Sequence, residues 1–270
     1  MKTISQYQPR GLNKALGFVL IMILLFSMEN AYAGKWTLST SFSYNNANYI
    51  YAETIQSYYI NLGLRYNSGD LMISAYLPFI MQNDIFSDSL LPGPLTSDHM
   101  DNTTAEHNLN SGIGDIFLYS EYRFFNPSGA IPAFYLTAQL KIPTSADLSL
   151  FSTGEFDYGI GLAARKLYGS FYVFANAGYQ YFGNPPGILY RNPFSFGAGA
   201  SRFFAYGKYA LNLYFRTYSE IINGIEPPRQ LSLGFSAALS RETILSLYLI
   251  KGFSESSPDF AFTAGLDWAL

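Results

Sequence analysis

The chain contains no cysteine, only two histidines and two tryptophans, and few charged residues, at 13% of the total. The absence of cysteine excludes thiol catalysis and thiolate metal sites. Basic residues number 16 against 19 acidic ones, so the formal charge of −3 leaves no broad basic face for nucleic acid. Beyond residue 33 no apolar run exceeds the length of a strand, which argues against a membrane-spanning helix in that part.

The first 33 residues have the pattern of a signal peptide. A positively charged start precedes an apolar core of about a dozen residues, which is short for a spanning helix, and Ala31-Tyr32-Ala33 forms a small-x-small cleavage site. The positive charges are Lys2, Arg10 and Lys14. We therefore predict a cleaved signal peptide at 1–33 and one domain at 34–270, with an uncleaved N-terminal anchor as the alternative.

About a dozen stretches of this domain alternate an apolar residue with a small or polar one. In the last stretch Phe260, Phe262 and Leu266 fall on one face, whereas Thr263 and Gly265 fall on the other. Side chains on a strand alternate between faces, so this rhythm gives each strand one apolar face. In an exported chain it predicts an all-β fold: a transmembrane antiparallel up-and-down β-barrel of about 12 strands, with lipid outside and a polar lumen inside.

The connections between these stretches alternate in length. Short turns are expected near 67–70, 125–131, 168–170, 205–208 and 240–243, with longer connections between them, the longest running from Gln82 to Asn110. Outer-membrane barrels have short periplasmic turns and longer extracellular loops. This pattern places both ends of the domain in the periplasm, and ten or fourteen strands remain as alternatives.

The composition also argues against the alternative of a secreted soluble β-sandwich or lipocalin-like barrel. Tyrosine and phenylalanine number 23 each, while mean hydropathy is only +0.08, as expected when lipid-facing and lumen-facing residues average out. A soluble barrel would have to bury about fifty large apolar groups, more than one small core holds. The membrane barrel is the better prediction.

The alternation assigns a set of charged and aromatic side chains to the lumen. We predict as lumen-lining residues Arg65, Tyr76, Asp115, Tyr119, Glu121, Arg123, Tyr135, Lys141, Asp157, Arg165, Tyr172, Tyr214 and Arg216. Such charges either pair across the barrel and stiffen it or line a permeation path that selects solutes. Both signs are present, so strong ion selection does not follow from composition.

Both histidines, His99 and His107, lie in the long 81–110 connection among several acidic residues. Asp98-His99 and Glu106-His107 could supply a base for a lipid or peptide hydrolase, or a weak metal site. A solvated loop explains the same residues. We therefore predict no catalytic residues, no metal site and no cofactor, and keep a barrel enzyme as an alternative.

Several segments resemble the outer-membrane barrel family named for the MetA pathway of phenol degradation. They are Gly112-Ile113-Gly114-Asp115 with Tyr122-Arg123-Phe124, Leu140-Lys141-Ile142-Pro143-Thr144, the run from Thr153 to Gly161, and Asn176-Ala177-Gly178-Tyr179. Ser257-Pro258-Asp259-Phe260 is similar to a neighbouring family of outer-membrane barrels of unknown function. The resemblance implies a passive uptake channel for small hydrophobic or aromatic compounds and brings no catalytic residues.

Together these observations predict a passive channel for small molecules in the outer membrane of a Gram-negative bacterium. The expected partners are outer-membrane lipid, a small-molecule solute, periplasmic chaperones and the barrel-assembly machinery, without nucleic acid. The 81–110 loop is expected to gate the lumen. A closed structural or adhesive barrel, its lumen filled by paired charges and rings, is the second alternative.

Overall fold

The computed structural model describes residues 34–48, 55–83, 109–145 and 151–270. Within these ranges strands make up the fold, with one short 3-10 turn at Ala205–Gly207. The strands are β1 (Lys35–Ala47), β2 (Ile55–Ser68), β3 (Leu71–Asn83), β4 (Leu109–Ile113), β5 (Ile116–Phe125), β6 (Ala133–Ile142), β7 (Asp157–Tyr168), β8 (Phe171–Tyr181), β9 (Phe194–Phe204), β10 (Tyr209–Tyr218), β11 (Arg229–Ala238), β12 (Thr243–Gly252) and β13 (Phe260–Ala269). None of the helical structure in these ranges is long and apolar enough to cross a membrane.

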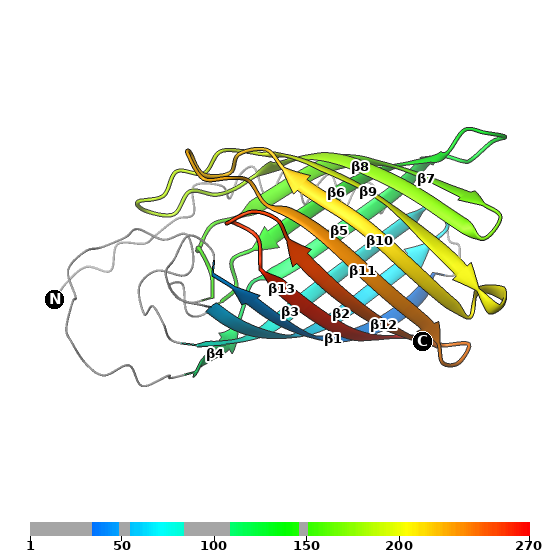
Figure 1. The fold of residues 1–270 in the computed structure, drawn as a ribbon, viewed down its shortest axis with the longest axis horizontal. Coiled ribbons are helices and arrows are strands. Elements are labelled where there is room, and N and C mark those ends of the chain that lie inside the picture. Colours follow the sequence, from blue (N-terminus) through cyan, green and yellow to red (C-terminus); the bar gives the residue numbers. More distant parts are fainter. Residues whose placement is uncertain (1–33, 49–54, 84–108, 146–150) are drawn as a thin grey trace.

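The strands form one closed antiparallel barrel (Figure 1). Apart from β4 and β5, described strands that are neighbours in the chain pair with each other, and the first strand, β1, also pairs with the last, β13, from Thr37 opposite Ala269 to Asn46 opposite Phe260. Strands β4 and β5 both pair with β3 and together occupy one position in the wall. The barrel therefore has 12 wall positions, which confirms the predicted fold class.

A bulge separates β4 from β5 in the wall. Phe79 lies opposite Ile113, whereas Tyr76 lies opposite Phe117, so the β4–β5 side carries one extra residue, Asp115. Pro78, opposite the break, has no backbone N–H to donate, although its carbonyl accepts from the Gly114 N–H at 2.9 Å. The bulge changes which residues face inward on either side of it.

The registers place large apolar side chains together on the outer surface of the wall. Leu62, Ile160, Leu162 and Phe194 are all more than half exposed there. Without lipid such exposure would be unfavourable, at about 25 cal/mol for each Å² of apolar surface. Leu140 is only 1% exposed, and it lies opposite Leu118 and Tyr158 on the neighbouring strands.

Short turns and long connections lie at opposite ends of the barrel (Figure 1). Strands β2 and β3, and β7 and β8, are joined by two-residue turns whose glycines, Gly69 and Gly169, have positive φ values of 53° and 59°. The C-terminus lies at this same end. The predicted signal peptide at 1–33 and most of the predicted 81–110 loop, including His99 and His107, lie outside the described residues.

Candidate functional site

The lumen is the candidate site, and charged side chains enter it in clusters that cross-link the wall. At the short-turn end, Arg65 on β2 donates from Nη2 to Asp267 Oδ2 on β13 at 2.8 Å. Ser39 on the intervening β1 donates to Asp267 Oδ1 at 2.6 Å. The Asp267 carboxylate therefore joins three adjacent strands, β2, β1 and β13, which include the first and last strands of the barrel.

Arg123 lies at the same end of the barrel but binds a turn rather than a wall strand. Its Nε donates to Asp70 Oδ1 at 2.6 Å, across from β5 to the turn that joins β2 and β3. Both side chains are about one-third exposed, with exposed fractions of 35% and 38%. Arg123 therefore fixes the rim of the barrel rather than its middle.

A second cluster joins β5 to β7 across β6. Arg165 donates to both carboxylate oxygens of Glu121, a bidentate pair that adds geometric specificity to the charge. The Arg165 guanidinium carbon lies 4.4 Å from the centre of the Tyr135 ring on β6, in cation–π geometry. Tyr172, on the neighbouring β8, lies with its ring centre 6.0 Å from that of Phe174.

The third cluster lies at the long-loop end. Lys141 Nζ is 2.6 Å from Asp157 Oδ2 and 3.8 Å from Asp115 Oδ2. The bulged Asp115 side chain, only 4% exposed, accepts hydrogen bonds from the backbone N–H groups of Thr144 and Ser145 at 3.0 and 3.2 Å.

This cluster also holds the connection between β6 and β7. The Ser152 hydroxyl donates to Asp115 Oδ2 at 2.7 Å, and Lys141 donates to Thr153 Oγ1 at 2.9 Å. The Phe151 ring lies over Gly112, where an added Cβ would be 2.6 Å from the ring. Asp115 therefore holds this segment against the mouth of the barrel.

Several inward-facing rings lie flat over glycines of the next strand. An added Cβ on Gly63 would lie 2.6 Å from the Tyr76 ring, and one on Gly199 would lie 2.6 Å from Phe174. Tyr214 stacks on Phe174 with ring centres 5.6 Å apart, and its hydroxyl donates to Asn176 Oδ1 at 3.2 Å. These glycines keep the rings close to the wall, which leaves space in the lumen.

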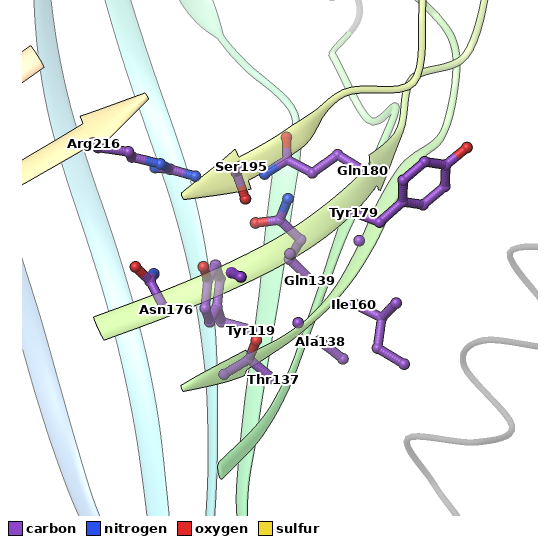
Figure 2. Close-up of a pocket in the computed structure, with 14 residues that line it drawn as sticks. Tyr119, Thr137, Ala138, Gln139, Ile160, Asn176, Tyr179, Gln180, Ser195 and Arg216 are labelled. Carbon is purple, nitrogen blue, oxygen red and sulfur yellow. The ribbon is translucent and has the colours of Figure 1, made fainter. Parts of the chain in front are cut away.

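A polar cavity of about 40 Å³ lies against the inner wall of β7 and β8 (Figure 2). Arg216 reaches into it from β10, and Tyr119 lines it from β5. Its other polar side chains are Thr137, Gln139, Asn176, Gln180 and Ser195. Figure 2 shows Ile160 and Tyr179 on the opposite side of the wall. No carboxylate is among the residues that line this cavity.

A second cavity, of about 250 Å³, lies beside the Arg65–Asp267 pair, both of which line it. Hydroxyl, amide and tyrosine side chains line it, including those of Asn61, Tyr76 and Tyr248. The lumen is therefore not completely packed with side chains over the described part of the wall.

The lumen contains functional groups that the sequence prediction did not include. Asp267 and Asp70 are the partners of Arg65 and Arg123, and the amides of Gln139 and Asn176 line the cavity with Arg216. The alternation placed Asp267 on the face that points away from lipid. It did not identify Arg65 as the partner, because Arg65 lies 202 residues earlier in the chain. Tyr248 was missed because its strand is almost uniformly apolar; its position opposite Gly234 places it inside.

The described residues contain no group of three or more histidine, aspartate or glutamate side chains arranged to hold a metal ion. The suggested base or metal site at His99 and His107 lies outside them.

No family model and no curated protein matches the chain. Among solved structures, an outer-membrane channel from Pseudomonas putida F1 superposes with a TM-score of 0.67 and 13% identity, over 90% of this chain and 97% of that one. The beta domain of a Bordetella autotransporter superposes with a TM-score of 0.51 and 14% identity, over 88% and 100% of the two chains. At these identities the likeness establishes the outer-membrane barrel fold alone.

Proposed function

We propose that this protein is a passive channel for small molecules in the outer membrane of a Gram-negative bacterium. The carrying observation is the inverted wall, with large apolar side chains exposed outside and hydroxyl, amide and charged groups inside around unfilled space. A barrel whose outer face is apolar is stable in hydrocarbon, where every backbone group must find its partner within the wall. The fold shared with the Pseudomonas putida F1 channel supports this proposal.

Small and partly aromatic solutes suit this lumen best. Tyrosine rings such as Tyr119, Tyr76 and Tyr248 line both cavities, and each presents an apolar face with a polar edge. The resemblance to the family named for the MetA pathway of phenol degradation favours the same class of solute. Transport down a gradient would need no cofactor or energy source.

Reconstitution of the folded 34–270 protein tests the proposal. Liposome swelling with small aromatic and sugar solutes should show solute flux, and planar bilayers should show stepwise conductance. A matched pair of variants locates the path: Asn176→Trp adds bulk to the cavity, while Ala177→Trp adds the same bulk to the outer face of the same strand. Only the first should reduce conductance.

Folded wild-type protein with neither conductance nor solute flux would contradict the channel and favour the closed structural barrel. The three cross-wall clusters described above are the features that such a barrel would use. Equal conductance in the two tryptophan variants would place the path away from β8.

A further inference from the structure

Arg216 differs in its charge balance from four basic residues on the strands around the lumen. Each of those four has a carboxylate partner within 4 Å: Arg65 with Asp267, Arg123 with Asp70, Lys141 with Asp157, and Arg165 with Glu121. Arg216 forms no ion pair with any residue in the described ranges. Its guanidinium carbon instead lies 4.6 Å from the centre of the Tyr218 ring on its own strand.

The groups around Arg216 are neutral donors and acceptors. Hydroxyls and amides from β6, β8 and β9, together with the Tyr119 hydroxyl, line the same cavity. The acidic groups close to the cavity are already paired: Glu121, two residues from Tyr119 on β5, binds Arg165, and Asp157, two residues from Gly159 on β7, binds Lys141. The cavity therefore carries an uncompensated positive charge.

Three glycines form part of the wall beside this cavity, at Gly159, Gly161 and Gly178. Gly161 and Gly178 lie opposite each other on β7 and β8, and Gly159 lies beside Gln139. A Cβ on Gly161 would be 2.7 Å from the Ala177 carbonyl oxygen and 2.9 Å from Thr137 Oγ1. The glycines let the side chains of Thr137, Gln139 and Ser195 lie close to the wall, on the cavity that Arg216 and Tyr119 also line.

We propose that this cavity is an anion subsite in the permeation path, at which Arg216 binds the carboxylate or phenolate of a small aromatic solute. The guanidinium presents a fork of N–H donors that matches a carboxylate, and the ring of the solute lies beside the Tyr119 ring. This inference rests on the proposed channel function and specifies the chemistry of its solute.

Reversal potentials in planar bilayers test the subsite, first in a potassium chloride gradient and then with sodium acetate or sodium benzoate replacing chloride. Wild type should prefer anions, and benzoate should permeate better relative to acetate than its larger size predicts. Arg216→Gln should lower the anion-to-cation permeability ratio about fivefold, the effect of one unit charge at 4 Å in water. Arg216→Lys should retain the preference over potassium but lose the discrimination between benzoate and acetate.

Two further variants keep the test decisive. Gln139→Glu places a carboxylate in the same cavity with almost no change in shape, so it should lower the ratio as Arg216→Gln does, even where the latter folds poorly. The double variant Arg65→Gln/Asp267→Asn removes a neutral pair from the lumen and should leave the ratio unchanged. Heat-dependent migration in gel electrophoresis verifies that each variant is folded.

The outcomes separate the two proposals. Absence of conductance in folded wild type would overturn the channel itself. Conductance whose ion preference is the same in wild type, Arg216→Gln and Gln139→Glu would retain the channel and overturn the subsite. If both variants lose the preference for anions, but wild type shows no preference for benzoate over acetate, the aromatic part of the inference would be overturned.

Discussion

Arg65 on β2 and Asp267 on β13 meet at 2.8 Å across β1, although 202 residues separate them in the chain. They close the barrel between the strands that begin and end it. The side chains of Arg65 and Asp267 are about one-third exposed, with fractions of 30% and 36%. Ser39 donates a hydrogen bond to the other oxygen of the Asp267 carboxylate. The Arg65 Nε atom is buried without a hydrogen-bond partner among the described residues. This closure depends on every strand between them having the correct register.

Asp267→Asn should lower the free energy of unfolding by about 1 kcal/mol, the upper range for an exposed ion pair. The loss should be smaller in 1 M salt, because partly exposed charges are screened. Urea unfolding of the folded protein in detergent measures it. In a double-mutant cycle with Arg65→Gln, additive effects of the two substitutions would contradict a direct interaction.

Gly161→Ala should destabilise the barrel by about 1–3 kcal/mol, the usual cost of overpacking. Its new Cβ would meet a backbone oxygen, the Ala177 carbonyl at 2.7 Å, which cannot rotate away. Gly265 is the matched control, because its nearest neighbour would be Ser41 Cβ at 3.3 Å. Gly265→Ala should change stability by less than about 0.5 kcal/mol. Equal unfolding midpoints for the two variants would contradict the predicted close contact at Gly161.

The Asp115 side chain should determine how firmly the 151–156 segment is held. Asp115→Ala removes the acceptors for Thr144, Ser145 and Ser152, so amide hydrogen exchange in 151–156 should accelerate by about tenfold, which corresponds to one lost charge-assisted hydrogen bond. Exchange in β10 and β11 should not change. Mass spectrometry of the exchanged protein measures both regions. Unchanged protection of 151–156 would show that Phe151 packing alone holds the segment.

The sequence allowed the architecture to be predicted but not the contacts within the lumen. The period-two alternation is a local property of each strand, so it predicts which face Arg216 or Tyr119 occupies without knowledge of neighbouring strands. Partner identity depends on strand order and register, which is why Asp267 was not recognised as the partner of Arg65. The bulge at Asp115 likewise depends on Pro78 in the preceding strand.

The strand Thr243–Gly252 shows the limit of the alternation itself. Its residues are apolar on both faces near the centre, so no period could assign them. The assignment comes from Tyr248, which lies opposite Gly234 and whose ring occupies the space that a Cβ would need. Glycine opposite an aromatic residue on the next strand was the available signal, but it can be used only once the pairing is known.

The two tryptophans of the chain provide a test of which face contacts lipid. Trp36 on β1 and Trp268 on β13 lie on the outer face at the short-turn end, with exposed fractions of 46% and 57%. Indole rings favour the interface between hydrocarbon and water. In liposomes, phospholipids brominated near the headgroup should quench the fluorescence of both tryptophans more strongly than lipids brominated near the chain ends. Trp36→Phe and Trp268→Phe assign the signal to each residue.

An inward-facing tryptophan gives the matched control for this measurement. Ser246 on β12 faces the second cavity, so Ser246→Trp in a background lacking both natural tryptophans should place the indole inside the lumen. Its fluorescence should be quenched weakly by either lipid and more strongly by acrylamide from the aqueous phase. If instead Trp36 and Trp268 escape quenching by lipid while Ser246→Trp is quenched, the polar face of the wall would contact lipid, whereas the channel proposal requires that this face line the lumen.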